Sequence, residues 1–203
     1  MEKISKTGKD FEQTLNEILE ENGLAREDIV YTTGEVKKGL FKGETKELIV
    51  YKKEDIYSLA KDYLKEVITN LGLEVSFEVK KQDDKSIIKM YSNNNKVLIG
   101  HNGNTLRALE TLTKQKIQLE TGIYFVVSLD VENYKDKKIA RLERQAKQIA
   151  KEVAKTKVAA HLENMNAYER RVIHNILTDF KGVTTKSEGE EPNRHIVISP
   201  SNE

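Results

Sequence analysis

Four residues, Gly100, His101, Asn102 and Gly103, form a segment whose residue types could hold a phosphate group. Glycine at both ends permits backbone conformations and close approaches that a Cβ would block. Neither residue between the glycines carries a permanent charge, so the binding of an anion here would depend mainly on hydrogen bonds from backbone groups. An ordinary turn between two helices is the alternative interpretation.

The residues on either side of this turn also fit an anion site. The apolar run 97–99 precedes the turn and is expected to be buried, and a helical pattern follows it. Asn104 or Thr105 is expected to cap that helix, whose free N–H groups and dipole favour a negative charge. No Gly-Lys-Ser/Thr follows, so the segment is not a nucleotide-binding loop of the common kind.

A second group of candidate residues lies in a predicted helix over residues 167–180. Arg170 and His174 are four residues apart and therefore project from the same face. A cation and an imidazole on a rigid helix can hold a phosphate or stack against a base. Asn166 and Glu169 have the spacing of a capping box at the start of the helix. A solvated helix face is the alternative interpretation of this pair.

The loop after this helix leaves two roles open for Arg170. Gly189 and Pro192 indicate a turn that returns Arg194 beside the helix, where it would extend a basic surface with Arg171. The same loop carries the acidic residues Glu188, Glu190 and Glu191. Arg170 is therefore either a phosphate-binding cation or a structural cation that is paired with this acidic loop.

Basic residues are concentrated in a third place, a predicted helix within residues 134–158. This segment carries nine basic side chains against three acidic ones, although the net charge of the whole chain is only +1. A local concentration of this kind indicates a site for a polyanion, and an ordinary solvated face is the alternative. The basic side chains lie opposite an apolar stripe and include Lys137, Arg141, Arg144 and Lys151.

Composition excludes several kinds of chemistry. The chain has no cysteine, which removes disulfides, thiolate catalysis and zinc–thiolate sites. Its four histidines lack the spacing of a metal site, and no nucleophile and base stand in a catalytic pattern. We therefore expect no metal, no cofactor and no enzymatic activity. The N-terminus lacks the apolar core of a signal peptide and no apolar run could span a bilayer, so we expect a cytoplasmic protein.

The periodicity of apolar residues predicts an α+β protein of three small domains, over residues 1–52, 53–131 and 132–203. The first domain is predicted to contain a strand, a helix over 10–22, and strands over 29–33 and 47–52 joined by a basic, glycine-rich loop or hairpin. The second is predicted to have the order helix, strand, strand, helix, helix, strand, over 53–72, 73–80, 86–92, a short helix to 99, about 105–116, and 123–131, with a turn at Asp83-Asp84. The third is predicted to contain the basic helix, the helix 167–180, a loop and the strand 194–199.

The middle segment resembles a KH domain of the bacterial, type II order, with Gly100-His101-Asn102-Gly103 in the place of the Gly-x-x-Gly loop. The resemblance implies that this loop clamps single-stranded nucleic acid by its backbone. Bases would then lie in an adjoining groove, for which Leu98, Ile99 and Leu106 are the expected apolar residues. Such loops usually present Lys or Arg at a central position, so the loop of this chain is expected to bind weakly by itself.

The C-terminal segments "MNAYERRVIHNIL" and "TKSEGEEPNRHIVI" closely resemble the Arg-x-x-x-His domain, called R-three-H, a single-stranded nucleic-acid-binding module. With "KKGLFKG" in the first domain, the whole chain resembles the Jag family of bacterial RNA-binding proteins, also called KhpB or SpoIIIJ-associated proteins. Membership implies a Jag N-terminal domain, and a regulator or RNA chaperone linked to cell elongation, cell-wall homeostasis and sporulation.

The same resemblance implies a set of partners. These are single-stranded RNA or DNA, a small protein with a single KH domain, and a YidC-type membrane insertase. A homo-oligomer is also possible, because a KH strand or a long amphipathic helix can serve as an interface. Two other functions stay open: an enzyme acting on phosphate esters, and a protein-interaction scaffold that docks on the insertase and binds nucleic acid weakly.

Overall fold

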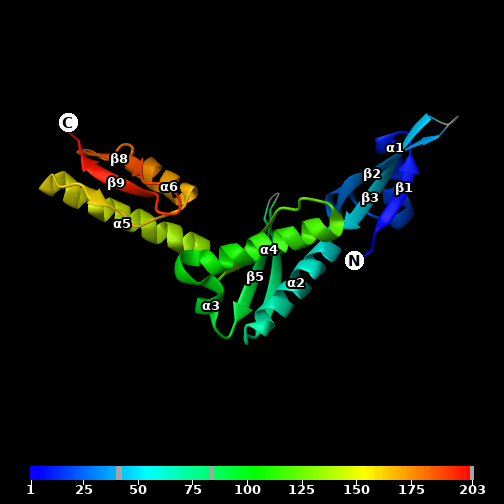
Figure 1. The fold of residues 1–203 in the computed structure, drawn as a ribbon, viewed down its shortest axis with the longest axis horizontal. Helices are drawn as coiled ribbons and strands as arrows, with labels where there is room; N and C mark the ends of the chain where they lie inside the picture. Colours follow the sequence, from blue (N-terminus) through cyan, green and yellow to red (C-terminus); the bar gives the residue numbers. More distant parts are fainter. Residues whose placement is uncertain (40–42, 83–84, 202–203) are drawn as a thin grey trace. The chain divides into compact units, whose positions relative to one another are not determined.

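The computed structural model describes residues 1–39, 43–82 and 85–201 of the chain. These residues form an α+β protein that divides into two compact units, Met1–Glu132 and Asn133–Glu203. The described residues contain three sheets of three strands each (Figure 1). The first unit contains two of these sheets and the second unit contains the third. The finer division into three domains stays a prediction.

The first sheet contains β1 (Ile4–Gly8), β2 (Ile29–Gly39) and β3 (Gly43–Lys52), with β3 in the centre and both neighbours antiparallel to it. Helix α1 (Phe11–Asn22) and the short helix η1 (Arg26–Asp28) connect β1 to β2. The α1 residues Leu15 and Ile18 are fully buried against the sheet, as their spacing predicts.

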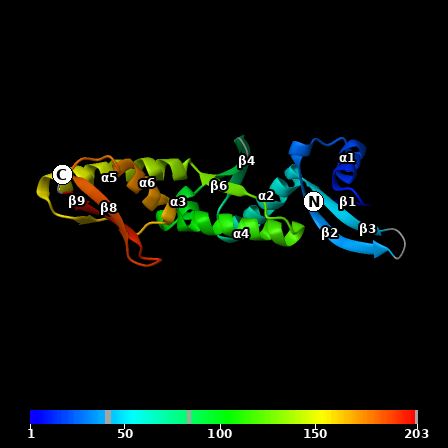
Figure 2. The ribbon, with the colours of Figure 1, turned by 90° about the horizontal axis from the view of Figure 1, so that it is seen from above.

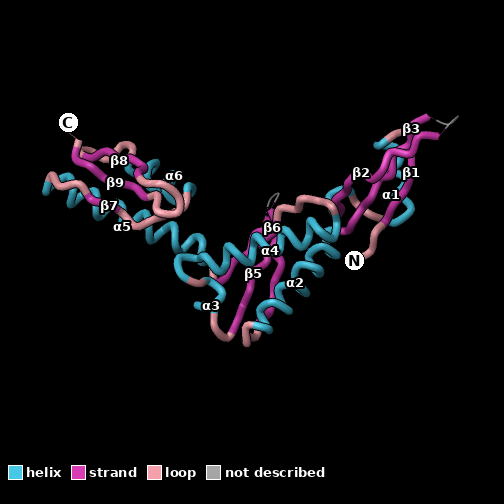
Figure 3. The backbone as a smooth tube through the Cα atoms, in the orientation of Figure 1, coloured by secondary structure: helices cyan, strands magenta, loops and turns pink. Residues whose placement is uncertain are grey.

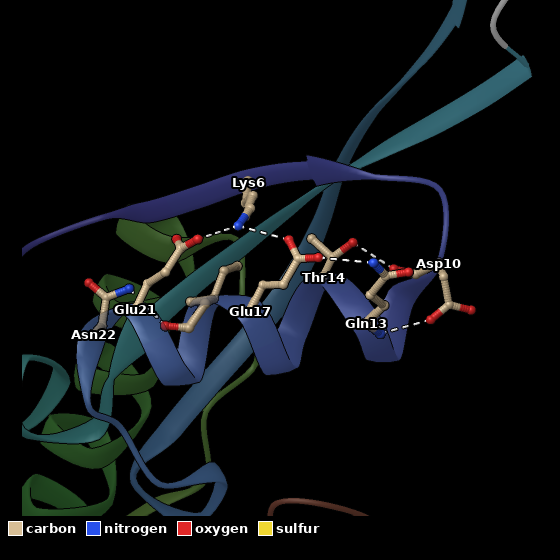
Figure 4. A network of polar contacts seen from close by, with 8 residues as sticks. Lys6, Asp10, Gln13, Thr14, Glu17, Glu21 and Asn22 are labelled. Carbon is tan, nitrogen blue, oxygen red and sulfur yellow. Dashed lines mark hydrogen bonds and ion pairs between the residues drawn. The ribbon is translucent and has the colours of Figure 1, made fainter.

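The ends of α1 are determined by local chemistry. Asp10 caps the N-terminus by accepting a hydrogen bond of 2.8 Å from the Gln13 backbone, and Gly23 ends the helix with a left-handed φ of 59°. On the exposed side, the Lys6 ammonium of β1 lies 2.8 Å from Glu17 and 2.6 Å from Glu21 (Figure 4). The hydrogen bond from Lys6 lowers the pKa of Glu17, and the bonds to both carboxylates raise the pKa of Lys6.

The second sheet has the order β4-β5-β6 and contains Val75–Gln82, Lys85–Ser92 and Val127–Val131. Strand β4 pairs antiparallel with β5, and β6 pairs parallel with β5. Helices α2 (Lys53–Asn70) and α4 (Asn104–Thr121) pack against each other on one face of the sheet (Figures 1 and 2). The parallel pairing is possible because α3 (Asn95–Ile99), the turn η2 (His101–Gly103) and α4 cross from β5 to β6. The predicted element order is confirmed.

The C-terminal unit begins with the long helix α5 (Tyr134–Thr156), followed by β7 (Ala160–His161), α6 (Ala167–Leu177), β8 (Val183–Glu188) and β9 (His195–Pro200). Strand β9 is central and pairs antiparallel with both neighbours. Figure 3 shows these strands in magenta. The core lies between this sheet and the two helices, and contains Ala146, Ala150, Ile173 and Ile198.

Several predicted elements differ from the structure. Strand β2 continues to Gly39, β3 begins at Gly43, and α6 ends at Leu177 rather than about residue 180. Strand β8 occupies residues that were predicted to be loop, because Val183 is its one apolar residue and the sequence shows no apolar alternation. Helix α4 continues to Thr121 rather than residue 116, and Gly122, with a φ of 71°, is the residue that ends it. Strand β6 begins at Val127 rather than residue 123. Residues 40–42 and the predicted turn at Asp83-Asp84 lie outside the described residues.

Substitution of a core leucine in α2 is expected to test the packing of the second sheet. Leu64 is fully buried, and Leu64→Ala should lower the free energy of unfolding by about 2–5 kcal/mol because the cavity is not refilled. The matched control is Leu119→Ala on α4, whose side chain is 84% exposed and which should change stability by less than about 0.5 kcal/mol. Denaturant titration measures both, and equal losses would contradict the described packing.

Candidate nucleic-acid interface

The turn between α3 and α4 requires glycine at its first end and has a left-handed glycine at its second. Gly100 has φ 70° and ψ −176°, a backbone conformation that is essentially restricted to glycine. A Cβ at Gly100 would also collide with the side chain of Thr105, whose own Cβ would lie 2.7 Å away. Gly103 has a φ of 81° and Asn102, between them, a φ of 51°. The sequence pattern therefore reflects a specific backbone path and not a loose connection.

This path leaves the N-terminus of α4 without a side-chain cap. The expected cap by Asn104 or Thr105 was wrong, because Gly103 occupies the capping position and both residues follow it. A glycine has no side-chain oxygen to accept from the first N–H groups of the helix. The Asn104 N–H already donates to the His101 carbonyl, so the N–H groups that follow it and the positive end of the helix dipole are the ones available to an anion such as a phosphate.

The side chains around the turn differ in part from the expectation. His101 is exposed and its Nε2 lies 3.3 Å from the side-chain nitrogen of Asn102. Leu98 and Leu106 are almost completely buried and cannot contact a ligand. Val97, which was expected to be buried, is 44% exposed instead, because the five-residue helix α3 turns this side chain outward. The apolar surface beside the turn thus comes from α3.

Helix α6 begins with the predicted capping box. The Asn166 side chain accepts a hydrogen bond of 3.0 Å from the Glu169 backbone, and Glu169 accepts one of 3.1 Å from the Asn166 backbone. The other carboxylate oxygen of Glu169 lies 2.6 Å from the Lys138 ammonium of α5. Glu169 is only 6% exposed, so its charge is compensated inside the unit. The sequence analysis missed this pair, although Lys138 lies at the edge of the apolar stripe of α5.

Arg170 is buried next to Glu169 and is only 8% exposed. Its Nη1 donates a hydrogen bond of 2.7 Å to the carbonyl of Met165 and lies 2.9 Å from a carboxylate oxygen of Glu191. The guanidinium therefore connects the start of α6 to the acidic loop between β8 and β9. Of the two roles left open by the sequence, this geometry favours the structural one.

His174 is exposed, one helical turn after Arg170 on the same side of α6. Its Nδ1 lies 2.7 Å from the hydroxyl of Thr185 on β8, which fixes the ring against the sheet. Arg194 is also exposed, and its Nε donates a hydrogen bond of 3.1 Å to the hydroxyl of Ser187. Arg171 points into solvent. The exposed Arg171, Arg194 and His174 are thus available for a ligand, whereas the buried Arg170 of α6 is already paired within the protein.

The solvent-facing side of α5 carries a line of basic residues that we call the basic line. Its members recur at spacings of three, four or seven residues, opposite the buried Ala146, Ala150 and Val153. All are exposed, and none forms an ion pair with any residue that the structure describes. At about 1.5 Å per residue, the line extends for roughly 27 Å. It consists of Lys137, Arg141, Arg144, Lys151 and Lys155.

Over residues 1–39, 43–82 and 85–201, no group of three His, Asp or Glu side chains is arranged to hold a metal ion. Within the same ranges, no helix has both the length and the apolar composition that crossing a bilayer requires. His161 and His195 contact each other, with 3.2 Å between Nδ1 and Nε2, and join β7 to β9.

Comparison with known proteins gives matches to two domain families and to whole proteins. A KH-domain model matches residues 60–138, and the R-three-H domain model matches residues 140–200. A relative from Clostridium symbiosum, described as RNA-binding protein KhpB, is 33% identical over 98% of this chain and 92% of its own length. A protein of the same description from Bacillus subtilis strain 168 is 31% identical over 98% of this chain and 99% of its own length.

Replacement of Arg170 is expected to destabilise the C-terminal unit. Arg170→Ala removes charge-assisted bonds from a buried site and should cost about 2 kcal/mol. In a unit of this size that lowers Tm by on the order of 10 °C, which thermal unfolding followed by circular dichroism measures.

The matched control for this experiment is Arg171→Ala at the next position, which is exposed and should leave Tm unchanged. The salt dependence of RNA binding would separate the two roles of Arg170. An unchanged Tm together with a weaker salt dependence for Arg170→Ala would contradict the structural role.

Proposed function

The chain belongs to the KhpB family, and from this membership we propose that it is a single-stranded RNA-binding protein in which the C-terminal unit attracts the RNA and the glycine turn positions it. The proposal assigns RNA to the turn at Gly100–Gly103 and to the exposed cations of the C-terminal unit. It is supported by the KH and R-three-H matches and by the description of the relatives as RNA-binding proteins.

The observation that carries the proposal is the basic line of α5. Unpaired cations on one exposed helix face repel each other and lower stability unless a polyanion neutralises them. Each phosphate that replaces a condensed counterion adds to the affinity through counterion release. The line is also rigid, since the opposite face of α5 is part of the core. A folded protein with this feature is well suited to a nucleic-acid backbone.

The glycine turn contributes position and not much attraction. The backbone N–H groups after Asn104 can donate hydrogen bonds to a phosphate, but His101 and Asn102 add no permanent cation. Phosphate contacts from a turn of this kind fix the register of a strand without reading its bases. We therefore propose that α5, Arg171 and Arg194 attract the RNA and that the glycine turn positions it. Arg170 stabilises the position of α6.

The finer parts of the proposal come from the family resemblance. We propose a cytoplasmic RNA chaperone or post-transcriptional regulator linked to cell elongation, cell-wall homeostasis or sporulation, which binds its ligand without transforming it. A small protein with a single KH domain and a YidC-type insertase are the proposed partners. The domain division proposed with them is 1–52 for docking, 53–131 for the KH domain and 132–203 for the R-three-H domain.

Binding of single-stranded RNA over a series of salt concentrations tests the proposal. With about three or four phosphates neutralised, log K should fall against log salt with a slope of roughly −2 to −3. Arg141→Gln with Arg144→Gln should make the slope shallower by about 1.4, since two released counterions are lost. The charge-matched control, Lys9→Gln with Lys65→Gln, should leave the slope unchanged. Filter binding measures the salt dependence of RNA affinity for the original chain and both double variants.

A second experiment tests the glycine turn. His101→Asp with Asn102→Asp should weaken RNA binding about tenfold, because each carboxylate at about 6 Å from a phosphate costs roughly 0.7 kcal/mol even in water. The control adds the same charge at exposed helix positions of the first unit, through Asn16→Asp with Ser58→Asp. A folded double variant that binds as tightly as the control would remove the turn from the proposal.

A further inference from the structure

The outer face of α6 carries three exposed residues, Tyr168, Arg171 and Asn175, at spacings of three and four. Residues at these spacings are neighbours on a helix surface. The opposite face holds Ile173 and Leu177, which are buried in the core. Arg171 was predicted as a site residue from the sequence and Tyr168, one turn before it, was not, although the two are three residues apart.

Tyr168 is 65% exposed, which is unusual for a side chain of its size in a folded unit. Two tyrosines of the first unit have partners: Tyr57 packs against Phe125, and the hydroxyl of Tyr91 donates to Glu78 at 2.8 Å. Tyr124, also in the first unit, is exposed to a similar extent as Tyr168, at 68%. Within the described part of the chain, the Tyr168 ring makes neither a ring contact nor a hydrogen bond. The ring therefore contributes nothing visible to the stability of α6.

Arg171, one helical turn after Tyr168, is also exposed and without a partner among the described residues, so no described carboxylate neutralises its guanidinium. The nearest acidic residue on the helix, Glu169, is directed inward to Lys138 and to the helix cap. An aromatic ring and an unneutralised guanidinium thus lie side by side on a rigid surface that is not used by the fold.

We infer that Tyr168 is a stacking platform for an unpaired base, with Arg171 at the adjoining phosphate and Asn175 within reach of the base edge. This inference rests on the proposed function and specifies its ligand as a strand with exposed base faces. An aromatic face stacks on any base, and a neighbouring arginine neutralises the phosphate that the base brings with it. In a duplex the base faces are covered by neighbouring pairs, so a duplex cannot use this site.

The chain offers a direct readout, because it contains no tryptophan. Tyr168→Trp places a single indole at the proposed site, and its fluorescence should be quenched when a single-stranded oligouridine is added. The quenching should saturate at the concentration at which filter binding saturates. A duplex RNA of the same length should not quench it. The matched control is Tyr124→Trp, at a tyrosine that is 68% exposed after the far end of α4, which should not respond.

Affinity measurements separate stacking from charge. Tyr168→Ala should weaken the binding of single-stranded RNA about tenfold at every salt concentration, with an unchanged salt slope because no charge is lost. Tyr168→Phe should bind like the original chain, since the ring is retained. Arg171→Gln should instead make the salt slope shallower by about 0.7.

The outcomes distinguish this inference from the proposed function. If the original chain binds no RNA at physiological salt, the proposed function fails and the stacking site fails with it. If the chain binds RNA but Tyr168→Ala retains full affinity, or Tyr168→Trp responds no more than Tyr124→Trp, only the stacking site is overturned. Equal quenching by duplex RNA would also overturn it, because stacking requires an unpaired base.

Discussion

The C-terminal unit depends on two adjacent buried charges of opposite sign, Glu169 and Arg170. A buried charge is tolerated only when it is paired and hydrogen-bonded, so each residue requires its own partners at fixed positions. Glu169 requires Lys138 of α5 and the backbone of Asn166, and Arg170 requires the Met165 carbonyl and the carboxylate of Glu191. Together these contacts fix α5, the entry to α6 and the loop before β9.

A comparable constraint in the first unit is steric and not electrostatic. The turn between α3 and α4 follows a path that only glycine can adopt at Gly100, and it ends in a glycine at the capping position of α4. The same turn leaves the N–H groups after Asn104 without a side-chain cap. In this turn, the same backbone path therefore accounts for the glycine at position 100 and for the capacity to hold an anion. In α6, by contrast, the buried Glu169–Arg170 pair and the exposed residues lie on different faces of the helix.

Much of this fold could be predicted from the sequence because its signals are local. The apolar spacing in α1 and α5, the capping box at Asn166 and the glycines after α1 act within one or two turns of helix. Strand β8 was missed because five of its six residues are polar, and what makes it a strand is its backbone pairing with β9, which residue types do not show. The burial of Arg170 was not predictable for a related reason: it depends on where Glu191 lies. Exposure of Val97 likewise follows from the path of α3 and not from residue type.

The two faces of α5 have different freedom to vary during evolution. Its inner face contains two small buried residues, Ala146 and Ala150. Larger side chains at these positions would not fit, because the core around them is closely packed. The basic line on its outer face forms no ion pair with the residues that the structure describes, so single codon changes there can add or remove a cation without a cost to the core. Descendants of one ancestral sequence could therefore tune how tightly they hold a polyanion to the ionic strength of their own cells, while the scaffold stays the same.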